Sequence, residues 1–508
     1  MKVHQFLDHY GVTENPFSQE DAASDQVFQD HCLEGTHHPA WDKVYGDPKA
    51  PSTSIVFGEQ GSGKTALRLQ IANKLIHYNQ DHHDERAFVL EYDDFNPFLD
   101  NFRERLSGSR RKPEKALQYW RLWDHMDAIL SLATTRLADM IRHDGKCQDE
   151  PTASLTQAQM GALSRTQKRD LLLLAAFYDN DRELAPDIRW ASLRKKLRFS
   201  TWSTWKYLLI GIAVTLFAFI GVFYYNKLAT QYFTDATGVS WFSPWLWGGI
   251  LLGWLPFAWR QLAAQWTGWR VSRQIRVIDH SPSVLRKILL QIDKSELSGQ
   301  PIPSRARGDD RYEMIMKLQS VLKTLGFTSI VVLVDRVDEP HLINGNAERI
   351  RDLLWPLFDN KFLKHPGIAF KLLLPSAVVG FLQRQEKEFY ERSRLDKQNL
   401  VQSLAWTGQA LYDVANDRIR ACAKLANSPP TLQTFFADSI SQAELVSQLD
   451  RLRAPRHLFK FLYRLLVDHC SKYTEDQPEW KIQPNTLQVT MSMFLRDLEN
   501  YDRKQGAG

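Results

Sequence analysis

The sequence has few cysteines, and they are not arranged in pairs. Cys32, Cys147, Cys422 and Cys470 lie far apart and form neither a CxxC pair nor a zinc-binding spacing. A disulfide-bonded secreted scaffold is therefore excluded, and we expect reduced thiols in a cytoplasmic setting. The first 17 residues also lack the apolar core of a secretory signal.

Glycine and proline are not enriched, and neither sign of charge dominates. The chain has 25 Gly and 22 Pro among 508 residues, and 44% of its residues are hydrophobic. This composition excludes gross disorder and collagen-like repeats, and the length allows two to four structural units. A formal net charge of +5 excludes a polycation, although a local basic patch for nucleic acid stays open. The cluster at 110–115 is interpreted as a solvated loop, and the histidine pairs at 37–38 and 82–83 are expected to be exposed.

Two long uncharged runs stand in the middle of the chain. Residues 207–225 (YLLIGIAVTLFAFIGVFYY) and 241–259 (WFSPWLWGGILLGWLPFAW) each comprise 19 residues without a charge. As a helix, each would span about 28 Å, close to the thickness of the hydrocarbon core of a bilayer. About 15 residues separate them, so they predict a two-helix transmembrane hairpin. The alternative interpretation is a buried hairpin in a large soluble core.

The flanks of the two runs predict an orientation. Basic residues precede the first run and follow the second: Arg194, Lys195, Lys196, Arg198, Lys206, Arg260, Arg270, Arg273 and Arg276. The connecting loop carries only Lys227 and Asp235. The positive-inside rule therefore places both termini on the cytoplasmic side, as in a multi-pass protein of a bacterial inner membrane. Neither run contains an ionisable residue, so the hairpin is expected to be an anchor or an oligomerisation element and not a transport path.

A glycine-rich loop follows a short apolar strand near the N-terminus. The strand 54–57 (SIVF) leads into Gly58-Glu59-Gln60-Gly61-Ser62-Gly63-Lys64-Thr65 and then into a helical pattern. This is GxxxxGK[ST] in the context of strand, loop and helix. The expected phosphate ligands are Gly58, Gln60, Gly61, Ser62, Gly63, Lys64 and Thr65. Lys64 is predicted to reach the β- and γ-phosphates of ATP, and the Thr65 hydroxyl to ligate Mg²⁺.

The matching acids are expected at the end of another apolar strand. Residues 329–334 (SIVVLV) are followed by Asp335, Arg336, Val337, Asp338 and Glu339. Asp335 is predicted to hold Mg²⁺, and Asp338 or Glu339 to polarise the attacking water. The alternative is that these acids merely cap the next helix.

Two further strands and the start of a helix near the C-terminus supply the remaining residues of the predicted site. Strand 87–92 precedes Asp93 and Asp94, which are interpreted as turn formers, and strand 369–374 ends before Ser376. Ser376 is a candidate to sense the γ-phosphate, or else an ordinary turn residue. Arg456 follows Pro455 at a helix start and could reach the γ-phosphate; the alternative is a surface arginine. Arg418 and Arg394 are weaker candidates for action on a neighbouring subunit, with surface salt bridges as the default.

These motifs resemble the STAND and KAP branches of the P-loop ATPases, relatives of AAA+. Asp335, Asp338 and Glu339 match the acid, variable, apolar, acidic-pair pattern of NACHT-type STAND proteins. KAP ATPases are similar in carrying transmembrane helices between the two nucleotide motifs, but their D-D-x-D motif is absent here. The opening Tyr10–Phe17 resembles the start of ExeA-type AAA ATPases. In standard AAA+ proteins a glutamate stands where this chain has Arg336, which leaves the identity of the catalytic base open.

The resemblance implies an α/β fold, with a P-loop (ASCE/AAA+-like) parallel sheet and a helical lid. We expect four parts: residues 1–100 and 311–400 as the two parts of the ATPase domain, 101–310 as a helical insertion with the hairpin, and 401–508 as an all-helical lid or a winged-helix-like tail. Helical patterns within the insertion cover residues 118–143, 163–178, 281–292 and 312–325.

Three functional hypotheses remain at this point. The first is an oligomeric, membrane-anchored ATPase switch or motor that acts with a separate effector protein, and the resemblance suggests phage defence or stress signalling. The second is a membrane scaffold that nucleotide merely stabilises. The third is an AAA+ remodeller of DNA or protein.

Overall fold

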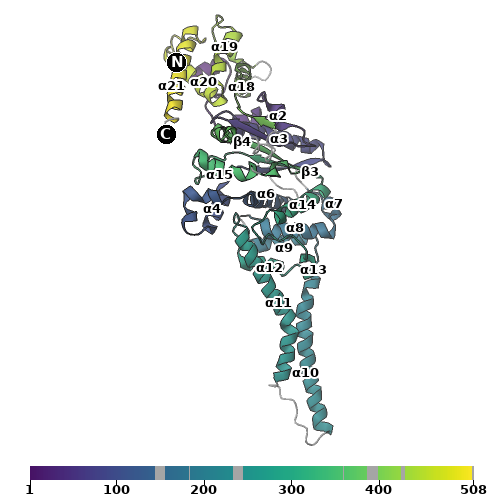
Figure 1. Ribbon diagram of the computed structural model, residues 1–508. Coiled ribbons are helices and arrows are strands. Elements are labelled where there is room, and N and C mark those ends of the chain that lie inside the picture. Colours follow the sequence, from purple (N-terminus) through teal and green to yellow (C-terminus); the bar gives the residue numbers. More distant parts are fainter. Residues whose placement is uncertain are drawn as a thin grey trace. The chain divides into compact units, whose positions relative to one another are not determined.

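The computed structural model describes residues 1–142, 155–181, 184–232, 244–358, 360–385, 399–424 and 429–505 (Figure 1). The chain divides into two compact units. Unit 1 comprises residues 1–95 and 328–508, and unit 2 comprises residues 96–327. The parts expected at 1–100, 311–400 and 401–508 therefore fall almost entirely into one unit. The insertion expected at 101–310 lies within the other.

A five-stranded parallel sheet forms the centre of unit 1. Its strands are β1 (Ser54–Gly58), β2 (Arg86–Tyr92), β3 (Phe327–Val334), β4 (Ile368–Pro375) and β5 (Asn399–Val401), in the order β2-β3-β4-β1-β5. The mixed α/β class and four strand predictions are confirmed. The fifth strand was missed because three residues are too short for a recognisable apolar run.

The register of the sheet brings three strand ends to one edge. Gly58 of β1 pairs with Pro375 of β4, and Val334 of β3 pairs with Leu372 of β4. In parallel sheets, ligands bind outside these carboxyl ends, at the strand where the connections change direction. Here that strand is β1, because the chain leaves it toward β2 and later returns to its other side as β5.

Helix α3 (Lys64–Asp81) covers one face of this sheet. Leu67, Ile71 and Leu75 recur at helical spacing, are all buried, and pack into one apolar cluster with strand residues such as Val56 and Leu373. The first turn of α3 is thereby fixed at the end of β1, directly behind the glycine-rich loop.

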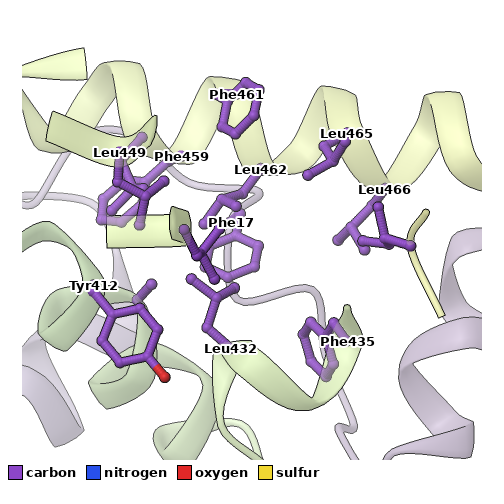
Figure 2. Close-up of a cluster of buried hydrophobic side chains, with 14 of the residues drawn as sticks. Phe17, Tyr412, Leu432, Phe435, Leu449, Phe459, Phe461, Leu462, Leu465 and Leu466 are labelled. Carbon is purple, nitrogen blue, oxygen red and sulfur yellow. The ribbon is translucent and has the colours of Figure 1, made fainter. Parts of the chain in front are cut away.

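The helices of unit 1 form a second apolar core that joins distant parts of the sequence (Figure 2). Phe6 of α1 (Val3–His9) and Phe17 are buried among helices from the last hundred residues. Figure 2 shows Phe17 surrounded by Leu432, Phe459 and Leu462. The other helices among the described residues of unit 1 are α2 (Trp41–Tyr45), α15 (Ala347–Phe358), α16 (Val379–Gln383), α18 (Gly408–Ala421), α19 (Gln442–Leu449), α20 (Pro455–Ser471) and α21 (Pro484–Gln505).

Unit 2 is helical in the part that the structure describes. Its helices are α4 (Asn96–Arg105), α5 (Pro113–Ala116), α6 (Leu122–Arg142), α7 (Gln157–Ala162), α8 (Arg165–Tyr178), α9 (Pro186–Lys196), α10 (Lys206–Tyr232), α11 (Pro244–Gln274), α12 (Pro282–Leu289), α13 (Lys294–Leu297) and α14 (Asp309–Thr324). Buried charges in its core are paired. Arg311 bonds Asp127 at 3.0 Å, and Tyr178 donates to the same carboxylate at 2.9 Å. Such pairing offsets the cost of burying a charge.

Helices α10 and α11 lie side by side as a long pair (Figure 1). The contact is close because glycines face large side chains. A Cβ on Gly253 would come within 2.5 Å of Val214, and a Cβ on Gly211 within 2.9 Å of Trp254. The Trp254 indole donates to the Thr215 hydroxyl at 3.0 Å, which ties the two helices together.

One helix in the described residues is long and apolar enough to cross a membrane by length and composition. It runs from Lys206 to Leu228, and only 6% of its most apolar window is buried by the rest of the chain. A core helix of a soluble protein would be covered. Helix α11 does not meet the same criterion, because glycine, proline and tryptophan interrupt its apolar run.

Some of the sequence predictions concern residues that lie outside the described ranges. They concern Cys147, Asp235 in the hairpin loop, positions 241–243 of the second run, Arg394, and positions 425–428 of the part expected at 401–508. Among the described residues of the C-terminal tail, Pro484–Gln505 form one long helix, α21, and Ile482 makes an isolated parallel bridge to Phe436, but no β-hairpin makes a wing.

His280 gives unit 2 a testable pH dependence. The side chain is buried, its Nε2 has no hydrogen-bond partner among the described residues, and burial lowers its pKa to about 4. The unfolded chain, with a pKa near 6.5, therefore binds more protons between pH 4 and 6.5, so stability falls as the pH drops through this window. We expect His280 to lower the free energy of unfolding by about 2 kcal/mol when the pH falls from 7 to 5.

The measurement is unfolding of the detergent-solubilised protein at both pH values, for wild type and for His280→Asn. The variant should lose less stability than wild type on acidification. An equal loss in both proteins would contradict the assignment.

Candidate nucleotide-binding site

The glycine-rich loop closes tightly between β1 and α3. Gly61 and Gly63 have φ angles of +84° and +90°, in the left-handed region that glycine adopts without a steric penalty. Gly63 is the residue before α3, whose first residue is Lys64. The first backbone N–H groups of a helix have no partner within the helix, so this helix start, together with the helix dipole, favours an anion at the loop.

Thr65 and Asp335 meet at the end of the sheet. The Thr65 Oγ1 donates to Asp335 Oδ2 at 2.8 Å, although 270 residues separate them in the sequence. Asp335 is only 1% exposed. Its burial raises the pKa of the carboxyl, while the Thr65 hydroxyl, the Arg336 backbone amide and the Arg68 guanidinium favour the charged form. The structure thus brings together the two oxygen ligands that the sequence predicts.

Lys64 lies at the same point. Its Nζ donates to the carbonyl oxygens of Gly58 and Glu59 at 2.9 and 2.8 Å, so it holds the loop in its curled form. Burial lowers its pKa, an effect that Asp338 and Asp335 oppose and Arg456 reinforces. An arriving anion would therefore restore the favoured charge on this amine.

The predicted acidic pair reaches the site. Asp338 and Glu339 line the same cavity as Lys64 and Thr65, and the cavity has a volume of about 260 Å³. Burial raises the pKa of Glu339, and the neighbouring Asp338 and Asp335 carboxylates act in the same direction, against Arg336. A carboxylate made more basic in this way is suited to accept a proton from water.

Arg456 approaches the loop from the helical part of unit 1. Pro455 begins α20, and the Arg456 amide donates to the Gly61 carbonyl at 3.3 Å. A Cβ on Gly61 would lie 2.6 Å from the Arg456 Cβ, so only glycine fits at this position. The guanidinium lines the cavity, with its Nε 3.8 Å from Glu20.

Other cavity residues come from segments that sequence reasoning did not connect with the site. The Trp406 indole donates to the Ser62 carbonyl at 2.8 Å and packs against Gly63. Asp25, Cys32 and His38 also line the cavity. His38 is buried, so its expected exposure is wrong: its Nε2 bonds the Ala405 carbonyl. A motif search gives no signal for such residues, because their partners lie hundreds of positions away.

The positions of Ser376 and Arg418 differ from those that the sequence predicts. Ser376 follows β4, is exposed, and is not among the residues that line the cavity. Arg418 lines the cavity but is only 3% exposed. Its guanidinium pairs with Asp25 at 2.5 Å and donates to the Pro16 carbonyl. These contacts hold Arg418 within its own chain, which disagrees with an action on a neighbouring subunit.

The buried pair of Asp25 and Arg418 yields a prediction on stability. Changing Arg418 to Met leaves Asp25 buried without its counter-charge, and changing Asp25 to Leu does the same to the arginine. Each single change should lower the free energy of unfolding by about 3–5 kcal/mol. The double variant should recover most of the loss, because no unpaired charge remains.

Denaturant unfolding of the four proteins in detergent measures the coupling. Losses that simply add in the double variant would show that the two charges do not depend on each other.

Known proteins provide no further guidance to this site. Comparisons with protein-family models, with curated proteins and with solved structures found no match.

Proposed function

We propose that this chain is a membrane-anchored ATPase whose nucleotide site lies on the cytoplasmic face. The contact between Thr65 and Asp335 carries the proposal. It joins the first residues of the helix behind the glycine-rich loop to the acid at the end of a separate strand. That pairing is what a P-loop site requires in order to hold a triphosphate together with its metal.

The residues present suit Mg²⁺ as a companion of ATP. Among the described residues, no group of three or more His, Cys, Asp or Glu side chains forms a protein-only metal cage. Thr65 and Asp335 offer instead one hydroxyl and one carboxylate, both hard oxygen donors. Magnesium typically takes one or two such ligands and completes its shell with phosphate and water. When bound, the ion neutralises charge that develops on the phosphates.

The chain's own residues then have distinct tasks. The loop amides and Lys64 bind the phosphates, and Lys64 exchanges its two carbonyl partners for phosphate oxygens. Glu339, or Asp338 beside it, orients a water and takes its proton as the oxygen attacks the γ-phosphorus. The bond to the β-phosphate breaks, giving ADP and inorganic phosphate. Arg456 links this event to the helical lid through its hold on Gly61.

The α10–α11 pair supports the membrane part of the proposal. Its outward side chains are apolar and uncovered; Phe217 is 76% exposed and Leu252 is 70% exposed. Arginines at the basic end stack on aromatic rings, with Arg270 over Trp266 and Arg273 over Trp269. Aromatic and basic residues of this kind gather where a helix leaves the bilayer. We propose that both helices cross, which leaves both termini on the cytoplasmic side of a bacterial inner membrane.

The biological role follows from the family resemblance alone. STAND- and KAP-like ATPases suggest an oligomeric switch that passes a signal to a separate effector protein, in stress response or phage defence. ATP binding would order the lid, and hydrolysis would reset it.

Nucleotide binding is tested at Lys64. Lys64→Ala should lower the affinity for a fluorescent ATP analogue at least about 100-fold, since a buried charge-assisted contact to phosphate is lost. Lys74→Ala is the matched control, because Lys74 is exposed on the same helix. Unchanged affinity in the Lys64 variant would refute the assignment of the site.

Turnover is tested in the same preparation with Glu339→Gln and Asp338→Asn. Retained ATP binding with lost hydrolysis in one variant identifies the base. Absence of turnover by the wild type with Mg²⁺ would favour the nucleotide-stabilised scaffold.

The membrane topology is tested with single added cysteines. Asn226→Cys, near the end of α10, should react with a membrane-impermeant maleimide in intact spheroplasts. Lys287→Cys, on an exposed position of α12, should react only after permeabilisation. The native protein gives the background, and its Cys32, Cys422 and Cys470 are buried. Equal labelling of both positions from outside would exclude the two-span arrangement.

A further inference from the structure

Arg336 stands at an unusual point of the backbone. It directly follows Asp335 at the end of β3, and its φ angle of +55° lies in the left-handed region. A residue other than glycine pays a strain cost of about 1–2 kcal/mol there. Such strain persists only where the surroundings demand it, and it often marks a functional site. Here the turn delivers the Arg336 amide to the Asp335 carboxylate and its side chain to the cavity wall.

Among the described residues, the guanidinium of Arg336 has only distant acidic partners. Its Nη2 lies 3.9 Å from Asp21 Oδ1, and its Nε lies 3.7 Å from Glu339 Oε1. Both separations exceed a hydrogen bond. The Nε atom is buried and has no hydrogen-bond partner among the described residues. A buried donor without an acceptor is unfavourable, so this arginine is poised to take a better anion.

The cavity provides a place for that anion. Lys64, Arg336 and Arg456 line it, and the Nε of Arg456 is likewise buried without a hydrogen-bond partner among the described residues. Lys64 belongs to the loop after β1, whereas Arg336 follows β3, and β4 lies between these strands. The ends of β1 and β3 are thus about 10 Å apart. A phosphate chain held by the loop at one end would meet Arg336 at the other, next to Asp338 and Glu339.

We propose that Arg336 binds the terminal phosphate of a nucleoside triphosphate, in exchange for the weak long-range attraction of Asp21 3.9 Å away. The inference rests on the proposed function and adds to it a residue that distinguishes triphosphate from diphosphate. A guanidinium can give two parallel hydrogen bonds to phosphate oxygens, which the present carboxylate contacts do not provide.

The test compares the affinities of the full-length protein for AMP-PNP and ADP in detergent, by calorimetry with Mg²⁺ present. Wild type should bind AMP-PNP more tightly than ADP. Arg336→Ala should lose about tenfold in affinity for AMP-PNP and keep its affinity for ADP, which also shows that the variant is folded. Arg336→Lys should recover only part of the loss, because an ammonium lacks the planar fork. Arg384→Ala, which removes the same charge from an exposed position, should change neither value.

Asp21 supplies the second arm of the experiment. Asp21→Asn should raise the affinity for AMP-PNP about threefold in wild type and have no effect in the Arg336→Ala background. Equal losses for AMP-PNP and ADP in Arg336→Ala, or no loss at all, would overturn the inference while leaving the proposed site intact. Failure of the wild type to bind either nucleotide would overturn the proposed function as well.

Discussion

The hydrogen bond between Thr65 and Asp335 is the contact on which the candidate site of unit 1 depends. It requires β1 and β3 to end at the same edge of one sheet, although all of unit 2 lies between them in the chain. The sheet order accommodates this insertion simply. The chain leaves after β2 and returns in β3, and these two strands are neighbours. Because unit 2 is inserted between two adjacent strands, it does not interrupt the pairing of β4, β1 and β5.

Around that contact, several cationic side chains of the cavity have no carboxylate within hydrogen-bond distance among the described residues. Lys64 is bound to carbonyl oxygens rather than to a carboxylate, and the arginines at positions 336 and 456 reach their acids only at long range. By comparison, Arg418, which also lines the cavity, is paired with Asp25 at 2.5 Å. The cavity lining therefore includes one buried ion pair and, among the described residues, cations without a close carboxylate partner.

The predictable parts of this molecule were those encoded locally. A short apolar run followed by glycines predicts a strand and a phosphate-binding loop from about a dozen consecutive residues. The acids after a buried apolar run are likewise recognised from local sequence. Trp406, Asp25 and His38 were not predictable, because each acquires its role from a partner elsewhere in the chain. Arg418 shows what the sequence alone could not predict. An arginine is usually a surface cation, and it is the fold that places Asp25 beside this one. Residue type alone also gave Ser376 a place beside the site, whereas the turn after β4 leaves its side chain outside the cavity.

The shared core of the two chain ends has a consequence for biosynthesis. Phe6 and Phe17 leave the ribosome first, yet the helices that bury them are made after residue 400. The α10–α11 pair is translated between these two events. If it enters the bilayer as proposed, insertion precedes closure of the cavity walls. A newly made chain would then complete the cavity only after it has been anchored.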